Sequence, residues 1–238
     1  MKKRFNRILF LVFISIGISA CSDNWCGVEG VGPIETQNRY LSSFDGVDLQ
    51  LSGNVRVTQD SVFSVEVTTY SNYHSLIQTY VRNGTLVIDS DKSLRDDDVR
   101  IEIHLPYLEY LSVGGSGSIV TTNYFNASYV KLQIAGSGKI DFAGSLSFAD
   151  ALISGSGDIY LNGHATNGKM TISGSGNIHA FPLTVLSNKV TISGSGNVET
   201  SVTSNLEVTI SGSGDVYYMG YPTLSVNVTG SGNVVHRN

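Results

Sequence analysis

The amino-acid sequence predicts an all-β protein, a parallel β-helix (solenoid) with coils of about 19 residues. The triplet Gly-Ser-Gly recurs seven times, at steps of 21, 19, 19, 20, 18 and 18 residues. Apolar residues keep a fixed place relative to each triplet and alternate with polar ones, as in strands with one buried face. No helical segment separates these strands, which argues against Rossmann and α/β-barrel folds.

The first twenty residues are typical of a lipoprotein signal peptide. Four basic side chains among the first seven residues precede the mostly apolar, uncharged run 8–20. A helix of that length spans about 20 Å, short of the roughly 30 Å hydrocarbon layer of a membrane. The run ends Ser19-Ala20-Cys21, which resembles a lipobox, and the resemblance implies cleavage before Cys21 and lipidation of Cys21. A plain secretory signal followed by a chance cysteine is the alternative.

We expect residues 21–33 to form a lipidated, Gly-rich and flexible tether, because they show no periodicity. Cys26 is the only other cysteine, so with Cys21 acylated the chain forms no internal disulfide; Cys26 is either free or paired between chains. Removing the four basic residues of the leader from the 15 in the chain leaves 11, against 20 acidic residues, a net charge of −9. Such a balance argues against nucleic-acid binding, so attachment to the membrane must come from the lipid.

Residues 34–110 alternate like strands but lack the triplet, and we predict irregular N-terminal β coils that also cap this end. Asn83-Gly84 indicates a tight turn between two strands. The spacing of Tyr73, Leu76, Ile77 and Tyr80 predicts one short helix. Residues 96–98, three consecutive aspartates, are predicted to form an exposed acidic loop.

Residues 111–238 are predicted to be the regular Gly-Ser-Gly β-helix, continuous with 34–110 in a single domain spanning 34–238. Three positions in each repeat are apolar throughout, and we expect them to face the core. They lie four and two residues before, and four residues after, the first glycine of each triplet. The glycines either bend the chain between two faces or let one coil pack closely on the next. These apolar positions are Leu111, Leu132, Ala151, Met170, Val190, Val208 and Val226; Val113, Ile134, Ile153, Ile172, Ile192, Ile210 and Val228; and Ile119, Ile140, Ile159, Ile178, Val198, Val216 and Val234.

An eight-stranded barrel or a β-sandwich is the alternative fold, although neither explains a fixed repeat phase. The C-terminal end has no recognisable cap, which leaves Val226, Val228 and Val234 in an edge coil with unpaired backbone. We expect contacts between identical chains to cover this edge.

Several phrases of the sequence resemble those of a known family. The phrases Phe44-Asp45-Gly46-Val47 and Asn83-Gly84-Thr85-Leu86-Val87-Ile88, with the serial Ile-Ser-Gly-Ser-Gly-Asn-Val, are similar to the family described as "putative auto-transporter adhesin, head GIN domain". The similarity covers residues 34–238. It implies a right-handed β-helix, a lipid-anchored protein of the bacterial cell envelope (we expect the outer membrane), and no enzymatic activity. It supplies no catalytic residue.

The residues themselves indicate no catalytic, metal or cofactor site. The position three after each first glycine holds only two acidic residues, Asp158 and Asp215, which lie three coils or about 14 Å apart, too far for an acid/base pair. Asn and Asp are common there because they suit turns. Calcium-binding β-helices use a nine-residue unit rich in Asp, which is absent here. His164 is a lone loop histidine. This row is Ser118, Lys139, Asp158, Asn177, Asn197, Asp215 and Asn233.

We therefore predict a non-enzymatic, adhesin-like protein that presents a flat Ser/Thr/Asn-rich surface to a glycan or an envelope protein. One alternative is a polysaccharide-processing enzyme whose carboxylates lie in the irregular region, with Asp96 to Asp98 as candidates. The other is a purely structural oligomeric subunit. Tyr217, Tyr218 and Tyr221 form an aromatic cluster that either stacks on a ligand or packs the return loop.

Overall fold

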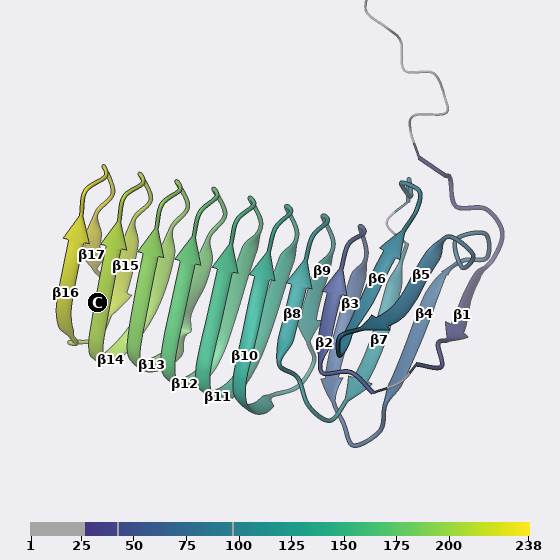
Figure 1. Ribbon diagram of the computed structural model, residues 1–238, viewed down its shortest axis with the longest axis horizontal. Helices are drawn as coiled ribbons and strands as arrows, with labels where there is room; N and C mark the ends of the chain where they lie inside the picture. The colour runs from purple at the N-terminus through teal and green to yellow at the C-terminus, as the bar shows by residue number, and fades with distance from the viewer. Residues whose placement is uncertain (1–26, 42, 97) are drawn as a thin grey trace, which may run out of the picture.

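The computed structural model describes residues 27–41, 43–96 and 98–238, and these form a β-solenoid of stacked coils (Figure 1). The described residues contain strands and turns but no helix, which confirms the predicted fold class. All 17 strands join in one hydrogen-bonded sheet that folds back on itself. The predicted signal peptide, the lipidation site Cys21 and Cys26 lie outside the described residues.

Each regular coil is a long strand that runs from one Gly-Ser-Gly corner, around a bend at the opposite edge, to the next corner. Successive coils pair in parallel, and Ile140 of one coil lies beside Ile159 of the next. Figure 1 shows the corners along the upper ridge and the bends along the lower one. The strands here are β8 (Tyr110–Val113), β9 (Ser118–Thr121), β10 (Phe125–Ile134), β11 (Lys139–Ile153), β12 (Asp158–Ile172), β13 (Ile178–Ile192), β14 (Val198–Ile210), β15 (Val216–Met219), β16 (Thr223–Val228) and β17 (Val234–His236).

Each coil therefore contributes to two flat sheets, which we name by whether the chain enters or leaves a corner there. The first sheet contains the segments that enter the corners, from β8 to β16; the second sheet contains those that leave them, from β9 to β17. The apolar side chains of both sheets point inward and stack into one continuous core. All the predicted core positions are buried except the three on the last coil, Val226, Val228 and Val234.

The corner glycines permit close stacking of coils, which decides between the two predicted roles. None of them has a positive φ. A Cβ at Gly157 would overlap the carbonyl oxygen of Gly138 in the preceding coil, and the same holds for Gly176 against Gly157. The backbone N–H of Ser156 donates to the carbonyl of Gly136 at 2.9 Å, so the corners are also joined along the solenoid axis.

The first coil lies between two coils that come later in the chain. Its strands are β2 (Gly46–Leu49) and β3 (Asn54–Gln59). In the first sheet β2 pairs with β6 on one side and β8 on the other, and in the second sheet β3 pairs with β7 and β9. After the first coil, the chain thus forms the end coil of the solenoid and then runs back past the first coil to β8 and β9. The strands of the end coil are β6 (Thr85–Ser90) and β7 (Arg100–Leu105).

Antiparallel strands cover this end of the solenoid. Strand β5 (Ile77–Arg82) pairs with β6 through a hairpin, and the turn residues Asn83 and Gly84 have φ of 51° and 77°, which confirms the predicted turn. On the other sheet, β4 (Ser64–Tyr70) pairs with β7, and β1 (Ile34–Asn38) pairs with β4.

The predicted short helix around Tyr73 is wrong. Residues 71–76 form a turn, in which the N–H groups of Leu76 and Ile77 both donate to the carbonyl of Tyr73 at 2.9 Å. Ile77 begins β5, and Tyr80 pairs with Val87 in the hairpin. Isolated short helices are costly to nucleate, and here the alternative is a strand with a ready partner.

Candidate binding surface

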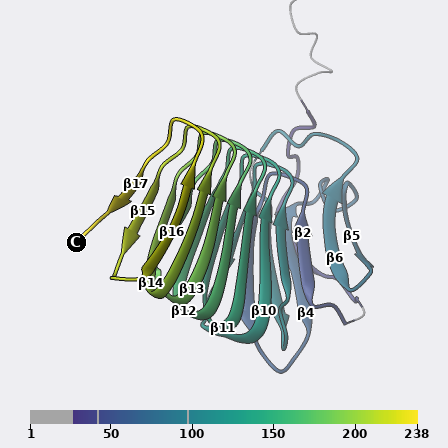
Figure 2. The ribbon, with the colours of Figure 1, turned by 60° about the vertical axis from the view of Figure 1, so that its left-hand side comes forward.

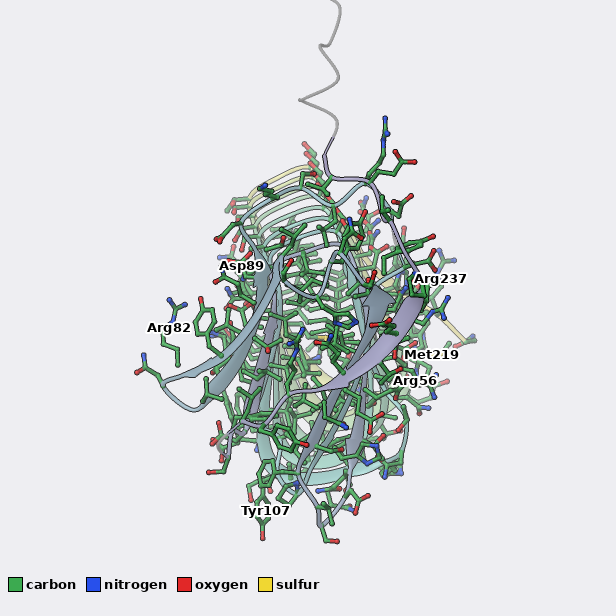
Figure 3. The ribbon with its side chains drawn as sticks, turned by 90° about the vertical axis from the view of Figure 1, so that its right-hand side faces the viewer. Arg56, Arg82, Asp89, Tyr107, Met219 and Arg237 are labelled. Carbon is green, nitrogen blue, oxygen red and sulfur yellow. The ribbon has the colours of Figure 1, made fainter. Side chains whose placement is uncertain are left out.

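The outward side chains of the second sheet stack into rows, because the coils pair in register. One row joins Asp141, Tyr160, His179, Glu199 and Tyr217. We call it the second-sheet row. Arg56, Met219 and Arg237, labelled along one side of the end-on view in Figure 3, project from this sheet, whereas Arg82 and Asp89 project from the other.

Neighbouring members of the second-sheet row interact directly. The ring of Tyr160 stacks on that of His179 with centroids 4.6 Å apart and planes 20° apart. His179 Nδ1 lies 2.9 Å from Glu199 Oε2. Lys139 Nζ lies 4.3 Å from the Tyr160 ring centroid, and Arg237 covers the ring of Tyr217 at 4.7 Å. This face therefore presents half-buried aromatic rings and polar groups held in place by their neighbours.

The outward face of the first sheet carries ion pairs between coils. Lys189 Nζ contacts Glu207 Oε1 at 2.6 Å, and Lys169 Nζ lies 3.9 Å from Asp150 Oδ2. The exposed hydroxyls of the predicted Ser/Thr/Asn-rich surface lie at the corners, as at Ser156, and also within the long strands, as at Thr166 of β12. The surface is thus more charged and more aromatic on its faces than predicted.

Asn and Asp three residues after the first corner glycine form a ladder along the corner. Asn177 Oδ1 accepts the backbone N–H of Asn197 at 3.0 Å, and Asn197 Oδ1 accepts that of Asp215 at 2.8 Å. Asp215 Oδ1 in turn accepts the N–H of Asn233 at 2.7 Å, and this bond holds the pKa of Asp215 below its ordinary value. Their role is structural, as expected, but the bonds join successive coils rather than closing local turns.

Asp96, the first residue of the predicted exposed acidic loop, is a structural clamp. Asp96 is half-buried, and its Oδ2 accepts the backbone N–H of Gly30 at 2.6 Å and lies 3.0 Å from the hydroxyl of Tyr73. The Gly30 bond is the main reason that the pKa of Asp96 is lowered. Asp98 pairs with Arg100 at 3.1 Å, and Asp97 lies outside the described residues. The two described aspartates are therefore engaged by their neighbours.

The same clamp corrects the prediction of a flexible tether for residues 27–33. Val28 forms a β-bridge with Leu94, and its carbonyl oxygen lies 2.7 Å from the hydroxyl of the fully buried Tyr73. Val31 N–H donates to Asn72 Oδ1 at 2.8 Å. This part of the chain is packed onto the end of the solenoid.

The tyrosine cluster near the C-terminus divides into two environments. Tyr218 pairs in register with the buried Thr200, so it occupies a core position of the last complete coil. Its ring lies 5.0 Å from that of His236, and Tyr221 lies 5.4 Å from His236. These rings cover part of the open core end, whereas Tyr217 faces outward. Tyr218 therefore has a packing role, which is the second of the two roles predicted for this cluster.

The rest of the C-terminal end is open. Strand β16 pairs only with β14, and β17 only with β15, within the described residues (Figure 2). Leu224, Val226 and Val228 lie in register with the buried Leu206, Val208 and Ile210, yet are 43%, 47% and 40% exposed. They are core side chains without a following coil.

Other candidate sites find little support in the geometry. His164 is an exposed residue of β12. Among the residues that the structure describes, no three His, Cys, Asp or Glu side chains gather as a metal site would require. No helix in the same part of the chain is long and apolar enough to cross a bilayer.

Residues 43–222 match the protein family described as "Putative auto-transporter adhesin, head GIN domain". The chain belongs to this family. Members are adhesin-like proteins of the bacterial surface or envelope. No curated protein matches the chain.

Solved structures share the fold. A putative adhesin from Bacteroides fragilis is 24% identical with a TM-score of 0.81, covering 89% of this chain and 100% of that one. A putative lipid binding protein from Parabacteroides distasonis is 24% identical with a TM-score of 0.76, covering 89% and 99%. A putative adhesin from Parabacteroides merdae is 20% identical with a TM-score of 0.69, covering 89% and 99%. At these identities the likeness establishes the solenoid fold alone.

Proposed function

We propose that this family member is a non-enzymatic, lipid-anchored envelope protein that binds a glycan or another protein through the outward rows of its solenoid. The observation that carries the proposal is the second-sheet row. Tyr160, His179 and Tyr217 hold ring edges and polar groups at a fixed repeat, on a rigid core. Aromatic and polar groups that are immobile before binding lose little conformational entropy when a partner arrives.

Three carboxylates considered as catalytic candidates, Asp96, Asp158 and Asp215, are engaged in structural hydrogen bonds rather than paired for glycoside hydrolysis. Glycosidases need two carboxyl groups facing one bond, at about 5–10 Å from each other. Asp158 and Asp215 belong to the corner ladder and are separated by two coils that carry Asn177 and Asn197. Asp96 is occupied by Gly30 and Tyr73.

The test is a glycan array probed with full-length protein, with released sugars quantified in parallel and envelope extracts screened on the same immobilised protein. Retention of a glycan or an envelope protein without sugar release supports the proposal. Tyr160→Ala should weaken that retention by about tenfold, because a central aromatic contact is lost. Lys169→Ala, on the first sheet, is the matched control. Release of oligosaccharide would establish the enzymatic alternative instead.

Anchoring through Cys21 is tested separately by fractionation. Several acyl chains bind a membrane far more firmly than one. The wild-type protein should remain with the membranes, and Cys21→Ser should release it to the soluble fraction. A Cys21→Ser variant that stays with the membranes would show that another feature attaches the protein.

A structural oligomer is the second candidate, favoured by the unpaired β16. This strand contains no charged residue, so nothing in it opposes pairing with the same strand of a second copy. Light scattering should then report a dimer that Val226→Lys converts to a monomer. A monomeric wild-type protein would exclude this candidate.

A further inference from the structure

Two adjoining hollows form a groove on the lower edge of the solenoid, near its irregular N-terminal end. One has a volume of about 420 Å³ and lies between Phe44, Phe63 and Tyr107. The other, of about 400 Å³, lies between Tyr107 and Tyr129. Both are lined by Tyr107 and Glu109, so they adjoin at these two residues, and we call them together the underside groove. Figure 3 shows Tyr107 projecting from this end of the molecule.

The groove exposes three aromatic rings; within the described residues Tyr107 stacks on no other ring, whereas Tyr129 is stacked on Phe148 with centroids 5.9 Å apart. Tyr107 is 74% exposed, and Phe63 and Tyr129 are 39% and 40% exposed. The ring of Phe63 is held edge-on against the buried Phe44, with centroids 5.6 Å apart. The groove therefore has fixed apolar platforms separated by open space. Such clusters on a protein surface mark binding sites more often than chance packing.

Polar groups lie between these rings. Asp45 and Glu109 line the first hollow, and Asn126 lines the second. Within the described part of the chain, the side chains of Asp45 and Glu109 take part in no ion pair. Carboxylates accept hydrogen bonds, and the Asn amide both donates and accepts. These groups suit a partner rich in hydroxyls.

The charge of the groove restricts the class of ligand further. Its charged lining residues are the carboxylates Asp45 and Glu109, and no cationic side chain lines either hollow. An anionic polymer such as a uronic-acid glycan or a nucleic acid would meet like charge here. A chain of neutral sugars offers apolar C–H faces to the rings and hydroxyls to the acceptors, without that repulsion.

We propose that the underside groove, centred on Tyr107 and Glu109, is a binding site for an uncharged oligosaccharide. This inference rests on the proposed function as a binding protein, but it assigns the ligand to a site distinct from the second-sheet row. The rings of Phe63, Tyr107 and Tyr129 stack on sugars, and Glu109 and Asn126 bond to their hydroxyls.

The experiment probes full-length wild-type protein and three variants, Tyr107→Ala, Tyr221→Ala and the Tyr160→Ala of the row, with cello-, xylo-, manno- and malto-oligosaccharides and with their uronic-acid counterparts. Tyr107→Ala removes the central platform and should weaken binding of a neutral probe by about tenfold or more. Tyr221→Ala, which removes a tyrosine of similar exposure (88%) at the opposite end, should bind as the wild type does. Equal melting temperatures would show that all three variants are folded.

The outcomes separate this inference from the proposed function. If the wild-type protein retains a neutral glycan and only Tyr160→Ala weakens it, the groove assignment is overturned and the proposed function stands. Preference for the uronic-acid probes also overturns the groove assignment. If the wild-type protein retains none of these oligosaccharides, the groove assignment fails, and the proposed function depends on the screen with envelope proteins alone.

Discussion

The two halves of the solenoid are stabilised in different ways. From β10 to β14 each coil repeats the aliphatic stack and the glycine corner of the previous one, and from β12 onward it also repeats the Asn/Asp bond. In residues 34–110, a coil is inserted between two later ones, and antiparallel strands close the end. Repetition gives a rigid scaffold with flat faces, whereas the break in the repeat provides closure and the underside groove. The regular half thus carries the second-sheet row, and the irregular half carries the proposed groove site.

The largest expected effect comes from placing a charge inside the regular half. Ile172 is fully buried between Ile153 and Ile192, so Ile172→Asp leaves an unpaired carboxylate in an apolar stack. We expect a loss of about 4 kcal/mol or more in unfolding free energy. Thr171→Asp, one residue earlier on the outward side, should cost less than about 1 kcal/mol. Urea unfolding measures both, and similar losses would contradict the assigned inward and outward faces.

A second substitution compares the corners of the two halves. Gly157→Ala drives a methyl group into the backbone carbonyl of Gly138, which cannot move without separating the coils. We expect a loss of about 3 kcal/mol. At the irregular corner, a Cβ on Gly53 would meet the side-chain Cδ1 of Leu51 at 2.9 Å, which can rotate, so Gly53→Ala should cost about 1 kcal/mol. Equal thermal shifts would show that the two corners are packed alike.

A third substitution affects the irregular end only. Tyr73→Phe removes the hydroxyl that links the Val28 carbonyl and Asp96, and each of these half-buried groups then keeps only its backbone partner, the N–H of Arg95 and of Gly30 respectively. A loss of about 1–2 kcal/mol is expected, together with faster proteolysis within residues 27–33. Tyr70→Phe, whose hydroxyl lies 3.5 Å from Asp98, is the control and should change neither. Protection of residues 27–33 in Tyr73→Phe would show that the clamp lies elsewhere.

The smallest effect is a dependence on pH at the same clamp. The pKa of Asp96 is lower in the folded chain than its ordinary value of 3.8, mainly through the Gly30 N–H. The ionised carboxylate therefore stabilises the fold above that value, and the stabilisation is lost as the pH falls through the folded pKa. Asp96→Asn should flatten the acid limb of the stability profile without shifting the alkaline side. An unchanged acid limb would contradict this role, because Asp60 and Asp215, whose pKa values are also lowered, are present in both proteins.

The regular half was predictable because its pattern determines both the length of each coil and which side chains point inward. Each triplet identifies a corner, and alternation about it separates buried from outward positions. The last coil is an exposed edge, as its lack of a cap predicted, since burial of Val226 and Val228 requires a following coil.

The irregular half was less predictable because its strands alternate without showing which strand lies beside them. Ser52-Gly53-Asn54-Val55 repeats the corner pattern of the later coils, and this match could have identified β2 and β3 as a coil. Nothing local indicates that this coil pairs with β6 and β8 at once. The aromatic residues of the groove come from separate turns, such as Phe63 and Tyr107, so their proximity depends on the same long-range pairing.

The central claim is that the solenoid is closed at its N-terminal end and open at its C-terminal end. Hydrogen exchange followed by mass spectrometry on dilute full-length protein tests it most directly. We expect slow exchange in β4, β6 and β13, and exchange in β16 and β17 that is faster by orders of magnitude. Exchange in β16 as slow as in β13 would contradict it, because the edge would then be covered.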